Sequence, residues 1–379
     1  SDGILRDEYL AEPELSDALE VIAWIAEQPW CDGKVGMMGK SWGGFNSLQV
    51  ASLQPPALKA IIAVAATDDR YADDIHFMGG CLLNENLTWS ATMLTFNTRP
   101  PDPLIVGECW LDMWKERLAA DEPWALTWLE HQRRDVYWEH GSVCENYDAI
   151  QVPVYAITGW SDGYSNVISR LMAGLKGPRR GVVGPWAHVY PHDGTPGPAI
   201  GFLQDALRWW DRWLKDRDTG IDHEPVYRVW MQESVAPAVN YAERPGRWVS
   251  EDPWPSSDIQ HKTLHLHGDN TLQDTPGEPG RRVFRSPAST GMDGEEWSSF
   301  GLAGELALDQ SSEDGRSLCF ETVPLTERLE LLGAPVIELE LASDKPVAQL
   351  AARLCDVAPD GASTLVTYGV LNLTHRDSH

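Results

Sequence analysis

The chain contains 379 residues, 42% of them hydrophobic, and its 57 acidic side chains outnumber the 30 basic ones, which gives a formal charge of −27. A chain of this length exceeds one ordinary hydrophobic core, so we expect two domains. The negative charge argues against nucleic acid or anionic lipid as a partner, because both would repel this surface. No apolar run approaches the roughly 18 residues of a membrane helix, so no membrane partner is expected.

The cysteines and histidines are too scattered to indicate a disulfide framework or a metal site. The six cysteines include no C-x-x-C pair, so we expect free thiols, which favour a cytoplasmic location. His265 and His267 would share one face of a strand, but no carboxylate or cysteine lies beside them at zinc spacing. We therefore expect no metal and no other cofactor.

The first 75 residues alternate between helical and strand patterns. Leu15, Leu19 and Ile22 recur at helical spacing within a predicted helix over 14–28, which Pro29 ends. Further elements follow along the chain, predicted as a strand at 34–38, a helix at 45–53 and a buried strand at 60–66. This alternation favours a parallel sheet with helices on both faces, and we assign residues 1–75 to the first part of such a core.

Residues 76–148 change in character, because tryptophans and charged side chains crowd together without a strand signal. We interpret this segment as a helical cap inserted into the core. The second part of the core, 149–219, resumes the earlier pattern with predicted strands at 152–157 and 180–184 and a helix at 202–215.

Beyond residue 220 the hydrophobic period becomes two. Alternating stretches are predicted as strands at 226–230, 263–267 and 336–341, and breaks rich in Pro and Gly separate them. This pattern favours an antiparallel β-sandwich of jelly-roll type over 220–379.

A nucleophile motif lies between the strand at 34–38 and the helix at 45–53. Gly39-Lys40-Ser41-Trp42-Gly43 matches G-x-S-x-G in the strand–turn–helix context that this motif requires. Such a tight turn presents the Ser41 hydroxyl at the carboxyl edge of the sheet, and the Trp42 N–H at the helix start points to the same place. Ser41 is therefore the candidate nucleophile and Trp42 the candidate oxyanion-hole donor.

The remaining members of a Ser-His-Asp triad are found after later strands, in the order that α/β-hydrolases require. Asp162 follows the strand at 152–157, and His188 follows the strand at 180–184. Open α/β sheets bind their ligands at this carboxyl edge. His192 is the rival base, but Pro191-His192-Asp193-Gly194 is typical of an outer turn, so we prefer His188.

A phosphate-binding loop is the competing interpretation of Gly39-Lys40-Ser41. The pattern G-x-x-x-x-G-K-[ST] needs glycine at position 34, which is Lys34. The intervening residues would also have to form a loop, whereas they are predicted as a strand. Nucleotide binding is therefore disfavoured.

The sequence as a whole resembles the X-prolyl dipeptidyl-peptidase-like hydrolases, the group that includes cocaine esterase and α-amino-acid ester hydrolases. The stretches that carry the resemblance span nearly the whole chain and are found at 21–30, 33–44, 79–80, 87–90, 159–163, 184–188, 211–215, 333–336 and 354–361. The loops around Asp162 and His188 are the most specific of them.

The resemblance implies an α/β-hydrolase core, a helical cap and a C-terminal jelly roll that closes the pocket. It implies an acyl-enzyme formed on Ser41, with His188 as base and then acid and Asp162 orienting it. Aromatic side chains of the cap and of the acid loop line the acyl pocket in such enzymes, and Trp89 and Tyr164 match those positions. Ordinary packing in the cap and in the loop is the alternative role for both residues.

Two departures from the family pattern concern the ends of the sequence. Family members have several strands before the helix at 14–28, including a tyrosine that completes the oxyanion hole, and their jelly rolls continue past a segment like 369–373. We therefore expect this sequence to be an internal piece of a longer protein, with its second oxyanion donor outside the piece. Such a piece is expected to be a poor catalyst.

Two functions of different classes follow from these observations. The leading hypothesis is a serine hydrolase that cleaves a small-molecule ester or amide, including amino-acid esters and X-Pro peptides. The alternative is a catalytically inactive α/β-hydrolase-fold binding module. The presence of all three triad residue types favours the enzyme. The acyl group, the leaving group and the oligomeric state are not determined by the sequence.

Overall fold

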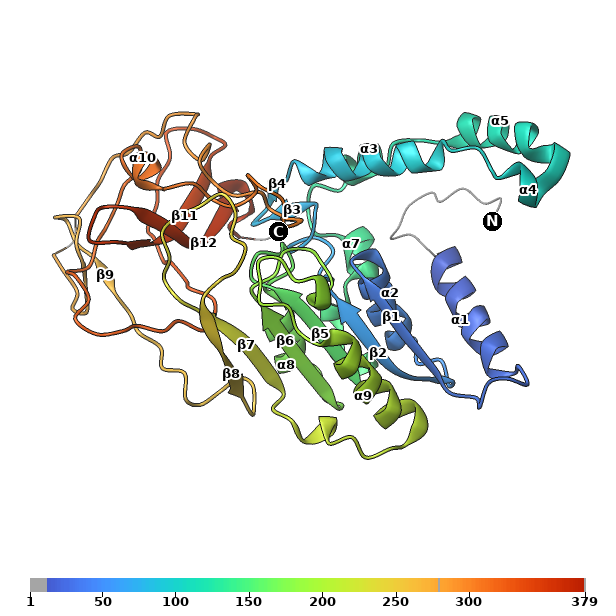
Figure 1. Cartoon of the computed structure of the whole chain (residues 1–379). Helices are drawn as coiled ribbons and strands as arrows, with labels where there is room; N and C mark the ends of the chain where they lie inside the picture. Colours follow the sequence, from blue (N-terminus) through green and yellow to red (C-terminus); the bar gives the residue numbers. More distant parts are fainter. Residues whose placement is uncertain (1–11, 279, 378–379) are drawn as a thin grey trace.

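The computed structural model describes residues 12–278 and 280–377, and a six-stranded sheet forms its centre (Figure 1). In spatial order the strands are β1 (Val35–Lys40), β2 (Leu58–Val64), β5 (Val154–Gly159), β6 (Arg179–Gly184), β7 (Tyr227–Gln232) and β8 (Gly246–Glu251). The first five are parallel to one another, and β8 is antiparallel to β7. The carboxyl ends of β1, β5 and β6 therefore lie at one edge of the sheet.

Both faces of the sheet are covered by helices, and β2 shows why. Ile61 and Ala63 point into one hydrophobic cluster, whereas Ala60, Ile62 and Val64 point into the cluster on the opposite face. The flanking helices are α1 (Glu12–Ala26), α2 (Trp42–Ser52), α8 (Val167–Gly174) and α9 (Phe202–Lys215). The first three contribute to the cluster around Ile61, and α9 packs on the other face. A strand buried on both faces is apolar, and β2 is apolar from Ala60 to Val64.

The segment between β2 and β5 forms the cap, which is mainly helical but begins with a short hairpin that the sequence pattern did not predict. Its elements are β3 (Phe77–Met78), β4 (Cys81–Leu82), α3 (Glu85–Asn97), α4 (Pro103–Val106), η1 (Gly107–Cys109), α5 (Trp110–Ala120), α6 (Ala125–Glu130), α7 (Val136–Gly141), η2 (Val143–Glu145) and η3 (Tyr147–Ala149). Figure 1 shows α3, α4 and α5 extending away from the sheet as an arm. The tryptophans near its base are buried, because Trp124, Trp128 and Trp138 form one cluster with Phe45 of α2.

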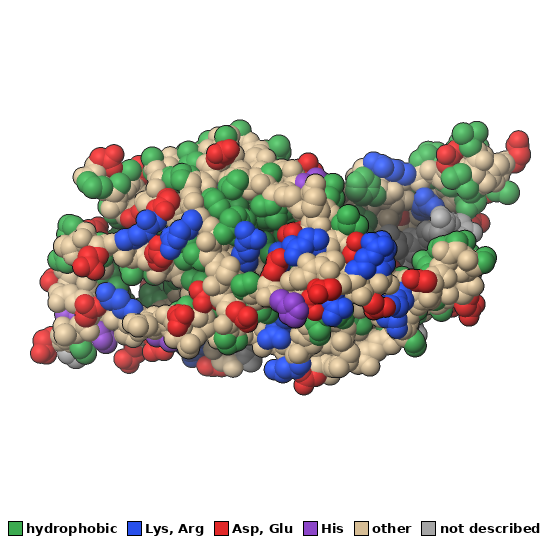
Figure 2. All heavy atoms as spheres, turned by 60° about the horizontal axis from the view of Figure 1, so that its bottom comes forward, with side chains coloured by type: hydrophobic (Ala, Val, Ile, Leu, Met, Phe, Trp, Pro, Cys, Tyr) green, Lys and Arg blue, Asp and Glu red, His purple; other side chains and the backbone are tan. Residues whose placement is uncertain are grey.

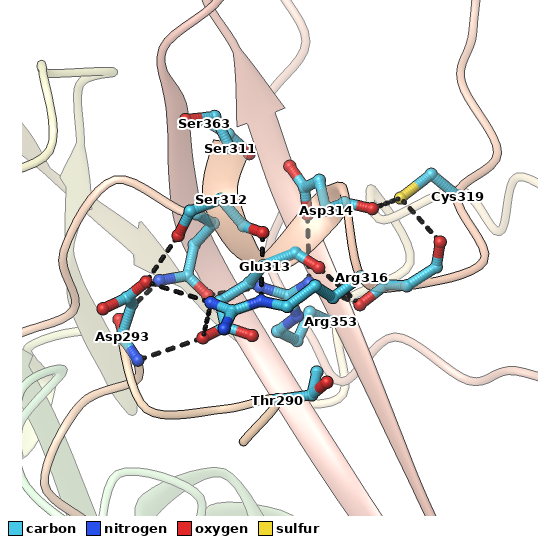
Figure 3. A network of polar contacts seen from close by, with 12 residues as sticks. Thr290, Asp293, Ser311, Ser312, Glu313, Asp314, Arg316, Cys319, Arg353 and Ser363 are labelled. Atoms are coloured by element: carbon cyan, nitrogen blue, oxygen red, sulfur yellow. Dashed lines mark hydrogen bonds and ion pairs between the residues drawn. The ribbon is translucent and has the colours of Figure 1, made fainter. Parts of the chain in front are cut away.

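The C-terminal region contains β-structure, but long irregular segments separate its few regular strands. It holds β9 (His265–Leu266), β10 (Leu272–Gln273), α10 (Ser311–Asp314), β11 (Gln349–Val357) and β12 (Ser363–Asn372). Figure 3 shows a polar network there, in which the fully buried Glu313 accepts hydrogen bonds from the Asp293 N–H and from Arg316. Arg353 of β11 reaches the same network through Asp314.

Two strands predicted for the sandwich differ in the structure. The stretch at 226–230 forms β7, which pairs with β6 and so belongs to the core sheet. Its period of two arises because Tyr227 and Val229 enter the core cluster while Arg228 between them is only half-buried. The stretch at 336–341 forms no regular strand, and Val336 and Ile337 are exposed.

Basic and acidic side chains lie side by side on the face that Figure 2 turns toward the viewer, although the chain carries a large negative charge. Ion pairs around α9 include Arg208 with Glu224 and Arg212 with Asp222. Within the described ranges, none of the helices combines the length and the apolar character that crossing a membrane requires.

Main-chain hydrogen bonds connect the turns that follow β5 and β6. The Trp160 N–H donates to the Gly184 carbonyl at 2.8 Å, and the Ser161 N–H donates to the Trp186 carbonyl at 3.1 Å. The main chains of the two turns approach so closely that a Cβ atom on Gly159 would lie 1.9 Å from the Trp186 carbonyl oxygen. Gly159 is therefore required for these two turns to lie against each other.

Replacing Gly159 with alanine is expected to destabilise the protein by about 3 kcal/mol, because the added methyl group forces the turns apart. The matched control is Gly369→Ala in β12, where a Cβ atom meets nothing within 4 Å. Thermal unfolding of both variants gives the comparison. Equal melting temperatures would contradict the steric argument.

Candidate active site

Ser41 lies on the sharp turn between β1 and α2. Its backbone has φ 59° and ψ −121°, a conformation that residues with a side chain rarely adopt. The turn is held on both sides, because the Ser41 N–H donates to the Val64 carbonyl of β2 and the Ser41 carbonyl accepts from Phe45. Such a strained strand-to-helix turn is typical of a nucleophile elbow.

Two glycines make this turn possible, and only one of them belongs to the G-x-S-x-G motif. A Cβ atom on Gly39 would lie 2.2 Å from the Gly43 carbonyl carbon, and one on Gly44 would lie 2.7 Å from the Ala66 Cβ. A Cβ atom on Gly43, in contrast, would meet nothing within 4 Å. The close approach of α2 to β1 and β2 therefore depends on Gly39 and Gly44.

Trp42 is the first residue of α2, an eleven-residue helix. Its main-chain N–H has no carbonyl acceptor within the helix and contributes to the positive end of the helix dipole. The Trp42 indole makes separate contacts, with a hydrogen bond to Glu14 and an edge contact to Trp124. The N–H is thus the group of Trp42 with the chemistry to bind an oxyanion beside Ser41.

Asp162 and His188 lie together at the carboxyl edge of the sheet, and both are buried. His188 Nδ1 is 3.1 Å and 3.3 Å from the two carboxylate oxygens of Asp162. The same carboxylate accepts hydrogen bonds from the Thr158 hydroxyl at 3.0 Å and the Tyr164 N–H at 3.1 Å. These donors fix the carboxylate so that it faces the imidazole ring.

The main chain of His188 is held as well, whereas no described residue bonds its Nε2. The His188 N–H donates to the Ser299 carbonyl at 2.7 Å, and the His188 carbonyl accepts from Lys40 Nζ at 3.1 Å. In the part of the chain that the structure describes, Nε2 makes no hydrogen bond, and none joins it to the Ser41 hydroxyl. His192 lies apart in a short 3-10 turn, where its ring stacks on Phe202 and lies near Asp193.

The two residues expected to line an acyl pocket occupy different surroundings. Trp89, on α3, is half-buried and packs against the aromatic cluster that contains Phe45 of α2. Tyr164 is buried, and its ring centroid lies 5.7 Å from that of His188 and 5.5 Å from that of Trp297. Its hydroxyl donates to Asp74 Oδ1 at 2.9 Å. Tyr164 is thus held by its hydroxyl and by its main-chain N–H.

Asp74 and Arg70 form a buried ion pair behind Tyr164. The Asp74 carboxylate lies 2.6 Å from Arg70 Nη1, and both side chains are only 1% exposed. Burial raises the pKa of Asp74 to about 6, although Arg70 and the Tyr164 hydroxyl both lower it. The guanidinium also lies over the Phe45 ring, 3.8 Å from its centroid. The network therefore links α2 to the acid loop.

A hollow of about 340 Å³ lies beside the acid loop but is not lined by Ser41, Asp162 or His188. Its lining residues are Asp69, Ala72, Asp73, Met78, Asn166 and Arg170. Arg170 pairs there with Asp73 and with the buried Asp68. No group of three metal-ligating side chains is found among residues 12–278 and 280–377.

Sequence reasoning did not find the groups that hold Asp162 and His188 in place. Thr158 lies near the end of β5, four residues before Asp162, and this short spacing was the available signal. Asp74 and Ser299 are distant in sequence, and no local pattern distinguishes them. Phe300, whose ring centroid lies 5.5 Å from that of His188, belongs to the same C-terminal segment.

The chain resembles several solved structures of hydrolases. An α-amino acid ester hydrolase aligns with 98% of this chain and 66% of its own, with a TM-score of 0.72 and 22% sequence identity. A CocE/NonD family hydrolase from Staphylococcus aureus aligns with 73% of this chain and 44% of its own, with a TM-score of 0.57 and 20% identity. These similarities confirm the predicted α/β-hydrolase core, and the region after it is rich in β-structure as expected.

Curated relatives share about a quarter of the sequence. The cocaine esterase of Rhodococcus sp. (strain MB1 Bresler) is 25% identical over 96% of this chain, and a Mycobacterium tuberculosis (strain CDC 1551 / Oshkosh) protein named as a serine esterase is 25% identical over the same share. The Xaa-Pro dipeptidyl-peptidase of Lactobacillus delbrueckii subsp. lactis is 22% identical over 86% of this chain. The chain spans 69%, 65% and 40% of the length of these three proteins, respectively.

Two family models match consecutive parts of the sequence. Residues 1–190 match the X-Pro dipeptidyl-peptidase (S15 family) model, and residues 219–379 match the X-Pro dipeptidyl-peptidase C-terminal non-catalytic domain. The resemblance recognised in the sequence is thereby confirmed: the chain belongs to the S15 family of X-Pro dipeptidyl-peptidases and related hydrolases.

Proposed function

We propose that this protein is a serine hydrolase that cleaves an acyl ester or amide through an acyl-enzyme, with Ser41, Asp162 and His188 as its triad. The hydrogen bond between Asp162 and His188 Nδ1 carries the proposal. It leaves Nε2 to exchange a proton with the nucleophile, as a triad base requires. The strained backbone of Ser41 supports its role as that nucleophile.

The reaction would proceed in two acyl transfers. His188 Nε2 takes the hydroxyl proton as Ser41 Oγ attacks the substrate carbonyl carbon, and the protonated imidazole then gives this proton to the leaving alcohol or amine. Water next attacks the acyl-enzyme with His188 again as base, which releases the acid and restores the serine. Asp162, which faces Nδ1, would hold the imidazole in the tautomer that carries its proton on that nitrogen.

The substrate class follows from the chemistry that the relatives share. They are named as a cocaine esterase, an α-amino acid ester hydrolase and an Xaa-Pro dipeptidyl-peptidase, so each acts on an ester or a peptide bond. We infer that this protein transfers a carboxylic acyl group to water. The Trp42 N–H is proposed to stabilise the oxyanion that each attack produces.

Tyr164 is proposed to position the triad as well as to shape the pocket. Its N–H donates to Asp162 while its hydroxyl donates to Asp74, so one residue connects the acid to the buried Arg70–Asp74 pair. A buried residue held by its main-chain N–H and by its hydroxyl has little freedom to adapt to different acyl groups. The specificity role expected for Tyr164 therefore becomes secondary to its supporting role.

Replacing Ser41 with alanine is expected to lower kcat by a factor on the order of 10⁶, because the acyl-enzyme has no other nucleophile. Hydrolysis of a simple p-nitrophenyl ester by the full-length protein measures this effect, and a fluorophosphonate probe measures labelling of the serine. Ser161→Ala, beside Asp162, is the control and should keep both signals. Labelling that persists in the Ser41 variant would refute the assignment and favour another nucleophile, whereas a wild-type protein without labelling would favour the inactive binding module.

Replacing Tyr164 with phenylalanine is expected to cost about 1–3 kcal/mol of unfolding free energy at pH 8, because the buried Asp74 carboxylate loses a donor. The hydroxyl of Tyr164 lowers the pKa of Asp74. Removing the hydroxyl should therefore raise this pKa from its value of about 6. A raised pKa stabilises the folded state only where the carboxyl is protonated, and this contribution is lost as pH rises. The loss should therefore be larger at pH 8 than at pH 5.

Urea unfolding at the two pH values tests this prediction. Tyr227→Phe is the matched control, because Tyr227 is a buried tyrosine of β7 for which the described residues provide no hydrogen-bond partner. An equal loss at both pH values in the Tyr164 variant would show that Asp74 does not depend on the hydroxyl.

Replacing Trp89 with alanine is expected to change kcat/KM for bulky acyl esters more than for acetyl esters, by about 10-fold or more. The reason is that a large side chain beside α2 is removed while the triad is left intact. The same ester series on Trp110→Ala, a cap tryptophan of α5, provides the control. A uniform loss across acyl groups would assign Trp89 to packing alone.

A further inference from the structure

Lys40 is the residue immediately before the candidate nucleophile, and its contact does not follow from the motif. The ammonium donates to the main-chain carbonyl of His188 at 3.1 Å. It also lies 5.7 Å from the centroid of the Tyr190 ring, two residues beyond His188. One side chain therefore connects the nucleophile strand to the loop that carries the candidate base.

The partner of this ammonium is unusual for a chain with so many carboxylates. The sequence has 57 acidic residues for 30 basic ones, yet no carboxylate forms an ion pair with Lys40 in the described parts of the chain. Lys34, at the other end of β1, instead pairs with the exposed Asp216. A half-buried ammonium that bonds a neutral carbonyl is held by the local geometry rather than by charge attraction alone.

The sheet topology makes this contact long-range. Strands β2 and β5 lie between β1 and β6, so the ends of β1 and β6 are separated by three strand spacings, or roughly 14 Å. The loop after β6 must therefore fold back over the sheet edge before His188 can approach Ser41. The Lys40 side chain, at the carboxyl end of β1, reaches this loop at the main-chain carbonyl of His188.

The two other contacts of His188 show what Lys40 adds. Asp162 holds the ring through Nδ1, and the Ser299 carbonyl holds the main-chain N–H. Without Lys40, the His188 carbonyl would keep no hydrogen-bond donor among the described residues, and the ring could shift away from Ser41 without breaking its bond to Asp162. A displacement of about 1 Å at a reacting group is enough to slow catalysis on the order of 100-fold.

We propose that Lys40 is a positioning residue that fixes His188 over Ser41 by holding its main-chain carbonyl. This inference rests on the proposed triad and adds a residue to it. Lys40 acts through His188 and does not touch the substrate, so its removal is expected to affect kcat and leave KM largely unchanged.

The test uses Lys40→Met and Lys40→Arg in the full-length protein, with Lys34→Met as the control. The methionine variant is expected to lower kcat for a p-nitrophenyl ester, and the rate of fluorophosphonate labelling, by about 10-fold to 100-fold. Lys40→Arg keeps a charged donor and should recover most of both rates. The control, whose lysine lies at the far end of β1, should match the wild type.

A second measurement reports on His188 without any substrate. The Nδ1 proton shared with Asp162 gives a low-field proton NMR signal, which should shift or broaden in Lys40→Met and return in Lys40→Arg. If Lys40→Met fails to fold by its melting curve, Lys40→Leu, which also lacks a donor, replaces it, with the same loss expected. Labelling and a low-field signal equal to the wild type in a folded variant would overturn the proposal.

The two proposals fail in different ways. A wild-type protein that is not labelled would reject the hydrolase function, and the NMR signal would still decide the role of Lys40. A labelled wild type with an equally labelled Lys40→Met variant would reject only the role of Lys40.

Discussion

The close contact between the turns after β5 and β6 is the constraint on which the candidate site depends. Gly159 lets the Trp186 main chain pass, and the bonds from Trp160 and Ser161 then hold the two turns in register. Asp162 and His188 face each other because each lies within three residues of this contact. The geometry of the acid–base pair is thus set mainly by backbone packing at the sheet edge, and the side chains complete it.

The candidate base is held by three regions that are distant in sequence. The turn after β5 provides Asp162, strand β1 provides Lys40, and the C-terminal region provides the Ser299 carbonyl. Because main-chain groups of His188 take two of these contacts, its position is largely independent of its protonation. An imidazole that gains and loses a proton in each cycle benefits from such support, since its ring contact with Asp162 changes in strength while the backbone contacts do not.

The sequence predicts the parts of this protein that depend on local patterns. Ser41, Asp162 and His188 could be named because a motif and the ends of successive strands identify them, and the core strands were predicted from their apolar runs. The position of β7 could not be predicted, since a period of two shows that one face is buried but not which sheet the strand joins. The support from Asp74 was also beyond prediction, because it lies 90 residues from Tyr164 and a buried carboxylate has no distinctive local pattern.

The position of β7 and β8 also bears on how the chain unfolds. These strands are matched by the C-terminal family model, yet they extend the core sheet beyond β6. Separating the C-terminal region would strip two strands from the sheet and expose the flank of the strand that leads to His188. The boundary between the two matched regions is therefore not a boundary between independent folding units, and their unfolding is thermodynamically coupled.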